Sequence, residues 1–275
     1  MWTSIFDAVS ISEQPAKPWR ATGGGRARLR IGLVWIEALS FPGALDAIAA
    51  LVERGEGGAV FTPNVDHVVK AKSNVAFQEA YANASLSLVD GMPLVWLARS
   101  VGFPVEGRIA GSDLTLPLMR LAALKKWRVY LLGGGPGIAE QAARLLIDTH
   151  GVNVVGWDSP KILADGSDVE GDSVSRAAMT RPDLIIVALG APKQELWIER
   201  GRRRLGAAVS LGLGGSLDFI VGRQKRAPRW MAASGLEWLY RMLQEPRRLW
   251  RRYLVEAPAF IPIAYNTWRA NRPRK

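Results

Sequence analysis

Polar side chains follow two short apolar segments of this 275-residue chain, each where a strand is predicted to end and a helix to begin. Thr62 and Asn64 follow the segment 59–61, and Asp90 follows the segment 86–89. In open α/β sheets, ligands bind beyond the carboxyl ends of the strands, so these side chains are expected to face one crevice. A carboxylate in such a crevice is suited to act as a general base. Asp90 is therefore the first candidate for a catalytic residue.

A structural role is the commoner one for an aspartate in this position. Asp90 is followed by Gly91, Met92 and Pro93, and a helix is predicted to begin near Pro93. An aspartate before a helix often accepts a hydrogen bond from a backbone N–H group of the first turn. The two roles are compatible, because a carboxylate at a helix N-terminus is also placed to face a ligand.

A glycine-rich turn joins a predicted strand to a predicted helix at the point where a phosphate group would bind. Helix N-termini offer free N–H groups and a positive dipole end to an anion. Ile138 stands at the third glycine position of the dinucleotide fingerprint, which argues against a dehydrogenase. Two interpretations of the turn stay open. It binds the diphosphate of a nucleotide sugar, or it is a tight turn that needs glycine for its shape. Its glycines are Gly133, Gly134, Gly135 and Gly137.

Another predicted helix begins after the apolar run LIIVALG, at Pro192. Lys193 and Gln194 then lie in the first turn, near the same crevice. Lys193 is placed to meet a phosphate group, and Gln194 is placed to form a hydrogen bond with a sugar or a leaving group. Alternatively, Lys193 is an ordinary solvated charge.

Short apolar strands alternate with helices along most of the chain. Strands are predicted at 30–36, 59–63, 86–89, 128–132, 152–155, 184–189 and 207–211, and helices at 43–54, 65–82, 93–101, 114–126 and up to 150. This alternation predicts an α/β fold, doubly wound around a mostly parallel sheet of Rossmann-like organisation. Three regions are expected: a mobile N-terminal segment (1–28), an α/β catalytic domain (29–222) and a basic amphipathic C-terminal appendage (223–275).

Basic residues are concentrated in the C-terminal appendage. Residues 223–275 hold 13 Lys and Arg but only 3 Asp and Glu. The whole chain has 36 basic and 25 acidic residues, so the other residues hold 23 basic and 22 acidic ones and are nearly neutral. Such asymmetry favours an anionic partner for the appendage, either a membrane surface or nucleic acid. The chain has no Cys and only two His, which excludes disulfides and thiolate zinc sites and argues against a histidine metal centre. Neither a signal peptide nor a membrane span is predicted.

Apolar and aromatic residues recur at helical spacing in the appendage, with arginines beside them. The apolar positions are Leu236, Leu239, Leu243, Trp250, Tyr253 and Leu254, and the arginines are Arg247, Arg248, Arg251 and Arg252. Pro246 is predicted to start a second helix. This composition suits the interface of an anionic bilayer, where each basic residue contributes about 1 kcal/mol. The alternative is that the apolar stripe packs on the core and the arginines are merely solvated.

Four ordered motifs, FTPNVDHV, LVDGMPLVW, GRIAGSDL and ALGAPKQE, resemble the motif set of the WecG/TagA/CpsF glycosyltransferases, glycosyltransferase family 26. The resemblance covers about residues 31–265. The active-site positions that it implies are Thr62, Asn64, Asp90, Arg108 and Gln194. It further implies that Asp90 is the base and that Arg108 stabilises the diphosphate leaving group.

The resemblance implies an inverting transfer from a UDP-sugar to a polyprenyl-diphosphate-linked sugar acceptor, for a cell-envelope or exported polysaccharide. The donor sugar is left open among N-acetylmannosamine, its uronic acid and glucose. Since no Asp-x-Asp pair occurs in the chain, the leaving group is expected to be stabilised by cations and helix dipoles, with no obligatory metal or other cofactor.

The resemblance also implies that the appendage docks beside the active site, in a peripheral protein at the cytoplasmic face of the inner membrane. Arg223, Lys225, Arg226 and Arg229 are then expected to reach the diphosphate of the acceptor. Two other functions stay open: a nucleotide-cofactor-binding oxidoreductase on the same type of sheet, and a non-enzymatic nucleic-acid or anionic-surface binder that uses the basic tail. The oligomeric state is not predicted.

Overall fold

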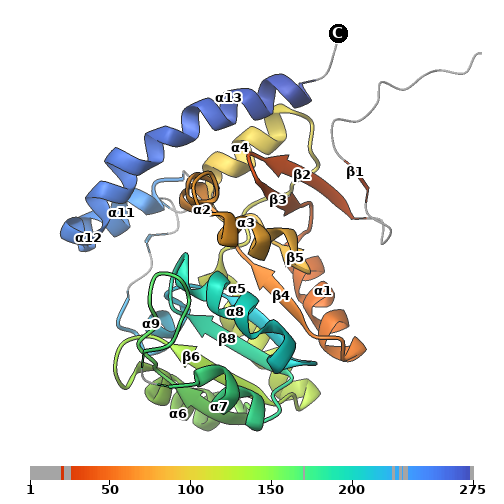
Figure 1. The fold of residues 1–275 in the computed structure, drawn as a ribbon, viewed down its shortest axis with the longest axis vertical. Coiled ribbons are helices and arrows are strands. Elements are labelled where there is room, and N and C mark those ends of the chain that lie inside the picture. Colours follow the sequence, from red (N-terminus) through yellow and green to blue (C-terminus); the bar gives the residue numbers. More distant parts are fainter. Residues whose placement is uncertain are drawn as a thin grey trace, which may run out of the picture.

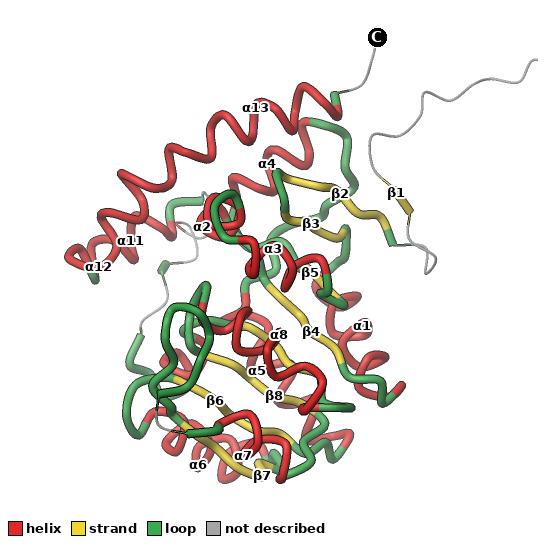
Figure 2. The backbone as a smooth tube through the Cα atoms, in the orientation of Figure 1, coloured by secondary structure: helices red, strands yellow, loops and turns green. Residues whose placement is uncertain are grey.

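The structure is a computed structural model that describes residues 20–21, 26–169, 171–224, 227–228, 231 and 235–272 (Figures 1 and 2). The elements are, in chain order, β1 (Arg20–Ala21), β2 (Ala27–Ile31), β3 (Val34–Glu37), α1 (Phe41–Arg54), β4 (Gly58–Phe61), α2 (Val65–Ala71), α3 (Val75–Ala82), β5 (Leu86–Ser87), α4 (Met92–Ser100), α5 (Gly111–Lys125), β6 (Val129–Gly133), α6 (Ile138–His150), β7 (Val154–Asp158), α7 (Ser173–Met179), β8 (Leu184–Ala188), α8 (Lys193–Leu205), β9 (Val209–Gly212), α9 (Ser216–Ile220), α11 (Glu237–Gln244), α12 (Pro246–Trp250), the π-helical turn η1 (Arg251–Glu256), the 3₁₀ turn η2 (Ala257–Ala259) and α13 (Phe260–Asn271). Within those ranges, no helix has both the length and the apolar character needed to cross a bilayer.

A six-stranded parallel sheet forms the centre of the molecule, with the strand order β5-β4-β9-β8-β6-β7. Both of its faces are buried, as β8 illustrates. Ile185 and Val187 of this strand pack with side chains from α2, α3, α4, α7 and α8, whereas Leu184 and Ile186 pack with side chains from α1, α5, α6 and α9. Because successive side chains of a strand point to opposite faces, the sheet is covered on both sides. The predicted doubly wound α/β fold is confirmed.

A β-hairpin replaces the single strand that was predicted at 30–36, and that prediction is wrong. Gly32 has a φ of 59° and reverses the chain between β2 and β3, which pair antiparallel. β1 adds a third strand, so residues 20–21 and 27–28 of the expected N-terminal segment lie in strands; residues 1–19 and 22–25 lie outside the described residues. Glu37, at the end of β3, is buried and accepts hydrogen bonds from Arg28 and from the amide of Ser87. This carboxylate therefore joins the hairpin to the edge strand β5.

The single helix predicted at 65–82 is two helices, α2 and α3. Asn74 ends the connection between them and accepts a 3.0 Å hydrogen bond from the amide of Phe77. Asparagine is a strong N-cap because its side chain satisfies a free N–H of the first turn, so a new helix starts there.

The C-terminal helices fold back over the body of the protein (Figure 1). α13 packs against β2, α2 and α4, and the buried hydroxyl of Thr267 accepts a 3.3 Å hydrogen bond from the amide of Gly32. Pro246 is the first residue of α12, as predicted. η1 and η2 of the same segment pack against α2, the helix that follows β4.

Candidate active site

Backbone pairing brings three loop segments together at the carboxyl edge of the sheet. The amide of Asp90 donates a 2.8 Å hydrogen bond to the carbonyl of Pro63, just before Asn64. On the other side, the amide of Ile109 donates a 2.7 Å hydrogen bond to the carbonyl of Val89. These bonds extend the parallel sheet pattern beyond the named strands, so residues distant in sequence become neighbours. Arg108 is thereby carried to the same edge as Asp90.

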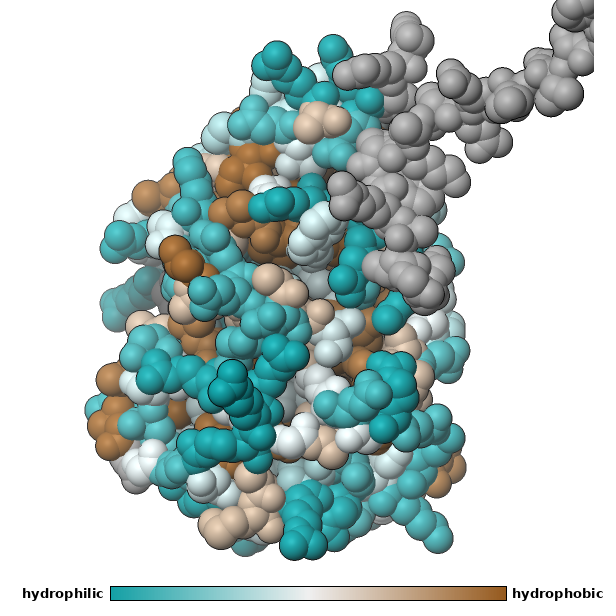
Figure 3. All heavy atoms as spheres, turned by 45° about the vertical axis from the view of Figure 1, so that its right-hand side comes forward, coloured by the Kyte–Doolittle hydropathy of each residue, from teal (hydrophilic) through white to brown (hydrophobic). Residues whose placement is uncertain are grey.

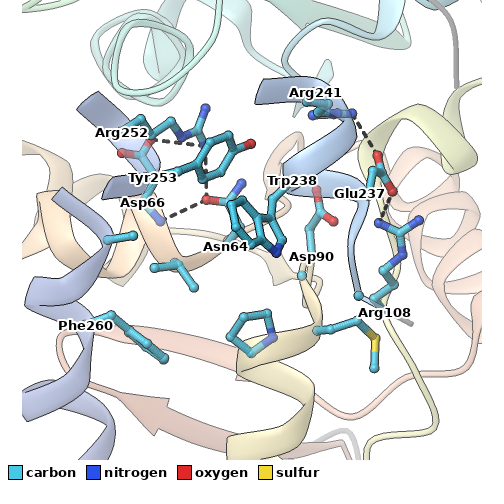
Figure 4. A pocket seen from close by; sticks show the side chains of 16 residues that line it. Asn64, Asp66, Asp90, Arg108, Glu237, Trp238, Arg241, Arg252, Tyr253 and Phe260 are labelled. Atoms are coloured by element: carbon cyan, nitrogen blue, oxygen red, sulfur yellow. Dashed lines mark hydrogen bonds and ion pairs between the residues drawn. The ribbon is translucent and has the colours of Figure 1, made fainter. Parts of the chain in front are cut away.

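A cavity of about 300 Å³ opens at this edge (Figure 4). The α/β body contributes one half of its lining, Asn64, Val65, Asp66, Asp90, Gly91, Met92, Pro93 and Arg108. The C-terminal segment contributes the other half, Gly235, Glu237, Trp238, Arg241, Arg252, Tyr253, Ala257 and Phe260. The size is at the lower end of the range for small-molecule sites, and charged groups meet an aromatic wall in it. The C-terminal segment is thus part of the wall of the site.

The carboxyl group of Asp90 lines this cavity and does not cap a helix. Gly91 is the N-cap of α4, with a φ of 113°, and no side chain makes a cap hydrogen bond there. Burial raises the pKa of Asp90 to about 6, an effect that the charges of Arg241 and Arg108 oppose and that of Glu237 reinforces. A carboxylate whose pKa approaches neutrality is matched to general-base catalysis. The structural alternative of a helix cap is therefore not what this side chain does.

Arg108 lies at the cavity wall and is paired with a residue of the C-terminal segment. Its Nη1 is 2.5 Å from Oε2 of Glu237, and its Nη2 is 3.7 Å from Oδ2 of Asp113. Arg241 contacts the second oxygen of Glu237, at 3.1 Å. Two guanidinium groups therefore converge on one carboxylate next to Asp90, as Figure 4 shows.

A second group of charges lies on the α2 side of the cavity. Nη2 of Arg252 is 3.3 Å from Oδ2 of Asp66 and donates a 3.3 Å hydrogen bond to Oδ1 of Asn64. Lys70, one turn further along α2, also pairs with Asp66. Although burial raises the pKa of Asp66, the charges of Arg252 and Lys70 outweigh it, and the pKa is lowered. Arg252 was predicted to meet the membrane or the acceptor, and the structure places it in this cavity.

Thr62 and Gln194 lie behind the cavity and do not line it. The buried hydroxyl of Thr62 donates to the carbonyl of Gly212, at 3.4 Å. Gln194, also buried, accepts a 2.9 Å hydrogen bond from the amide of Gly214 and donates a 2.8 Å hydrogen bond to Glu195. The two side chains therefore hold the loop after β9 in place.

Glu195 continues this buried network toward the site. Its Oε1 is 3.3 Å from Nε2 of His67, and Nδ1 of His67 lies 3.3 Å from the amide nitrogen of Asn64, which donates to it. Asn64 and His67 together form a capping box at the start of α2. Through this chain of contacts, the first turn of α8 fixes the position of Asn64.

Glycine is required in the turn after β6 by close backbone contacts. A Cβ on Gly133, whose φ is 104°, would lie 2.5 Å from the carbonyl oxygen of Ala188. A Cβ on Gly134 would lie 2.7 Å from Cγ2 of Ile138. Gly137, with a φ of 77°, is the N-cap of α6. These three glycines are explained by the shape of the turn.

Gly135 differs from the other glycines of this turn because its neighbour is a cation. A Cβ on Gly135 would lie 3.2 Å from Nη1 of Arg223. Arg223 was predicted to reach the acceptor, and the structure places it at the glycine turn instead. Lys193, the partly exposed first residue of α8, does not line the cavity.

The remaining basic candidates are exposed or undescribed. Arg247 and Arg251 are exposed, and Arg251 pairs with Glu256 at 3.6 Å. Lys225, Arg226, Arg229 and the side chain of Arg248 lie outside the described residues. A further cavity, of about 680 Å³, lies between α5, α6 and α9, and none of the predicted site residues lines it. Across the described part of the chain, no three His, Asp or Glu side chains gather in a group that would hold a metal ion.

Sequence reasoning did not assign to the site six charged or aromatic residues of the cavity, namely Asp66, Glu237, Trp238, Arg241, Tyr253 and Phe260. Asp66 lies within the motif FTPNVDHV, so the motif contained the signal. Glu237 and Arg241 are one helical turn apart in α11, a spacing that places both on one face. Nothing in the sequence indicates that this face meets Arg108, because the contact depends on how the C-terminal segment folds back on the body.

Comparisons with known proteins agree with this geometry. The family model described as "Glycosyl transferase WecG/TagA/CpsF family" matches residues 29–274. The chain is similar to the N-acetylglucosaminyldiphosphoundecaprenol N-acetyl-beta-D-mannosaminyltransferase of Bacillus spizizenii, with 34% identity over 221 residues, 80% of this chain and 83% of that protein. It is also similar to the protein of the same description from Bacillus subtilis, with 31% identity over 205 residues, 74% of this chain and 77% of that protein. The family match includes every residue that lines the 300 Å³ cavity.

Proposed function

The chain belongs to the WecG/TagA/CpsF family of glycosyltransferases, and from this premise we propose that it moves a sugar from a UDP-sugar to a polyprenyl-diphosphate-linked saccharide, with inversion at the anomeric carbon. The observation that carries the proposal is Asp90, a carboxylate with a pKa of about 6 in a cavity that also holds Arg108 and Arg241. The product would serve a cell-envelope or exported polysaccharide. Family membership favours this reaction over the oxidoreductase and nucleic-acid-binding alternatives.

Asp90 is the general base of the proposed reaction. The hydroxyl group of the acceptor sugar attacks the anomeric carbon of the donor and must lose its proton as the new bond forms. A carboxylate on the side opposite the leaving group accepts that proton, and inversion follows from attack on this side. The raised pKa of Asp90 makes it a stronger base than an exposed aspartate while leaving it ionised above about pH 6.

Departure of UDP leaves negative charge on the diphosphate, which needs fixed positive groups. Arg108 and Arg241 supply two guanidinium groups in the cavity, and Arg223 supplies a third at the glycine turn. Guanidinium groups suit this task because their N–H groups bind phosphate oxygens in a fixed fork. We propose that these cations and the start of α6 stabilise the leaving group without an obligatory metal.

The relatives' descriptions narrow the substrates. Both describe transfer of N-acetyl-beta-D-mannosamine to N-acetylglucosaminyldiphosphoundecaprenol. N-acetylmannosamine is therefore the favoured donor sugar of the three that the motifs left open, and a lipid-linked N-acetylglucosamine is the favoured acceptor.

A peripheral position at the cytoplasmic face of the inner membrane follows from such an acceptor. The exposed large apolar side chains of the C-terminal segment include Leu243, Trp250, Leu254, Val255, Ile261 and Tyr265. Figure 3 shows apolar surface in the upper half of the molecule, at the height of α4 and α13 in Figure 1. Exposed Arg247 and Arg251 lie in the same segment. Apolar, aromatic and cationic groups together favour adsorption to an anionic bilayer.

The experiment for this function is a donor and acceptor panel. The full chain is incubated with UDP-N-acetylmannosamine, UDP-N-acetylmannosaminuronic acid or UDP-glucose, with and without a short polyprenyl-diphosphate N-acetylglucosamine, and released UDP and lipid product are measured. We expect acceptor-dependent UDP release with UDP-N-acetylmannosamine and a product with the anomeric configuration inverted. A product that retains the configuration, or no turnover with any donor, contradicts the proposal. The same assay with added EDTA tests whether the transfer proceeds without a metal ion.

A further inference from the structure

Glu237 is held by two arginines inside the cavity. Its carboxylate oxygens lie 2.5 Å from Nη1 of Arg108 and 3.1 Å from Nη2 of Arg241. The side chains of Arg108 and Glu237 are each only 18% exposed, so solvent screens this pair weakly. One carboxylate thus bridges two guanidinium groups, an arrangement that is also typical of bound phosphate groups.

The ionisable groups of the cavity balance one another in the absence of substrate. Its cations are Arg108, Arg241 and Arg252, and its carboxylates are Asp66, Asp90 and Glu237. Asp66 already neutralises Arg252, and Glu237 is shared by the other two arginines. A diphosphate that enters a cavity of this composition gains little attraction unless one of the carboxylates leaves its arginines.

Glu237 is the carboxylate best placed to leave. Asp66 pairs with Lys70 as well as Arg252, and only 7% of its surface is exposed. Its displacement would therefore leave two cations without their ion-pair partner. Asp90 is needed beside the reacting hydroxyl. Glu237, by contrast, is the first residue of α11, where a longer side chain reaches the cavity from a helix end.

We propose that Arg108 and Arg241 form a phosphate-binding site in which Glu237 occupies the position of one phosphate group until the donor's diphosphate displaces it. This inference rests on the proposed function. It makes Glu237 a specificity-determining residue: a ligand must bring more negative charge than one carboxylate to gain from the exchange. A diphosphate meets that requirement, and an uncharged nucleoside does not.

The test is calorimetric titration of the full chain with UDP, uridine and inorganic pyrophosphate. The variant is Glu237→Gln, which keeps the size of the side chain and removes its charge. The matched control is Glu245→Gln, which removes the same charge from the same segment at a residue that does not line the cavity. We expect Glu237→Gln to bind UDP and pyrophosphate about fivefold more tightly than the wild type, the equivalent of about 1 kcal/mol. Uridine affinity is expected to be the same in all three proteins.

Two results overturn the inference. If Glu237→Gln binds UDP and pyrophosphate equally or more weakly, Glu237 positions the arginines and does not compete for them. If Glu245→Gln gains as much affinity, the effect is one of overall charge. If the wild type does not bind UDP but Glu237→Gln still gains affinity for pyrophosphate, the phosphate site stands and the nucleotide donor is wrong. Thermal unfolding verifies that each variant is folded, and a folded Arg241→Gln should lose pyrophosphate binding, because it lacks one of the two guanidinium groups of the site.

Discussion

Nη1 of Arg108 lies 2.5 Å from Oε2 of Glu237, so an arginine of the α/β body is paired with a glutamate of the C-terminal helix α11. This contact closes the wall of the cavity that contains Asp90. It shows that the appendage contributes directly to the charge of the site. The C-terminal segment contacts the body through η1 and η2, which pack against α2, and through α13, which packs against β2, α2 and α4.

The pH dependence of kcat/KM is expected to report the ionisation of Asp90. Its pKa is raised to about 6, and only the carboxylate accepts a proton, so activity should be full above this value and fall about tenfold per pH unit below it. The charge of Arg108 lowers the pKa of Asp90. Arg108→Gln should therefore shift this acidic limb of the pH profile, in which activity falls, to higher pH. It should also lower kcat by about 100-fold.

The control for that measurement is Arg120→Gln, which removes an exposed arginine away from the cavity. Its limb should coincide with that of the wild type. A limb near pH 4 in the wild type, or an equal displacement in both variants, would contradict the assignment of Asp90 as the titrating base.

Two glycine substitutions in the turn after β6 are expected to differ in their cost to stability. Gly133→Ala places a Cβ 2.5 Å from a backbone oxygen at a φ of 104°, so it should lower the free energy of unfolding by about 3 kcal/mol or more. Gly135→Ala meets only side-chain atoms, the end of Arg223 at 3.2 Å and Cγ1 of Ile138 at 3.8 Å, so its cost in stability should be below about 1 kcal/mol.

Gly135→Ala should nevertheless weaken UDP binding, because the added methyl group displaces the Arg223 guanidinium from the turn. Denaturant unfolding and UDP titration of both variants measure the two effects. UDP affinity unchanged in Gly135→Ala would mean that the glycine turn does not contact the nucleotide.

The buried network around Glu195 is expected to be important for stability. Glu195→Ala leaves the buried side chains of His67 and Gln194 without their shared acceptor, so the free energy of unfolding should fall by about 3 kcal/mol. Glu199→Ala, in the same helix, loses a 2.7 Å hydrogen bond to the exposed Asn83 and should cost about 1 kcal/mol or less. Urea unfolding compares the two, and equal losses would contradict this role.

Membrane adsorption is expected to depend on the exposed apolar residues of the C-terminal segment. Leu254 and Ile261 are 58% and 70% exposed, and their replacement by Ser should reduce co-sedimentation with liposomes that contain anionic lipid. Leu124→Ser, which alters an 81% exposed leucine of α5, is the control and should bind as the wild type does. If the double variant sediments as well as the control, another surface holds the protein at the membrane.

Local sequence patterns predicted the parallel sheet well because most of its strands are short apolar runs, and those of β4 and β5 are followed by polar residues. The same rule placed Asn64 and Asp90 at one edge. It failed for Thr62, whose side chain turns toward Gly212 and is buried. It also failed at Gly32, where a single residue with a positive φ turns an apolar run into a hairpin.

The other half of the cavity depends on tertiary packing that the sequence does not express locally. In the sequence, Glu237 and Arg241 have the i,i+4 spacing of an ordinary ion pair on a solvated helix. Arg252 was predicted to be one of several membrane-facing arginines, but in the structure it contacts Asp66 and Asn64. These roles follow from the docking of the C-terminal segment on the body, which spacing within the segment does not predict.

Asp90→Asn tests whether Asp90 is the base. Because burial raises the pKa of Asp90, its ionised form is less favourable in the folded than in the unfolded protein above about pH 6. The Asn variant should thus be at least as stable as the wild type at pH 8, and its melting temperature verifies that it is folded.

The most direct measurement is acceptor-dependent UDP release by wild type and Asp90→Asn at pH 8, with UDP-N-acetylmannosamine and a polyprenyl-diphosphate N-acetylglucosamine. We predict that kcat of the folded variant falls by about 100-fold or more, as expected when a general base is removed. A folded variant that releases UDP at the wild-type rate would contradict the claim, and the base would have to be another group of the cavity.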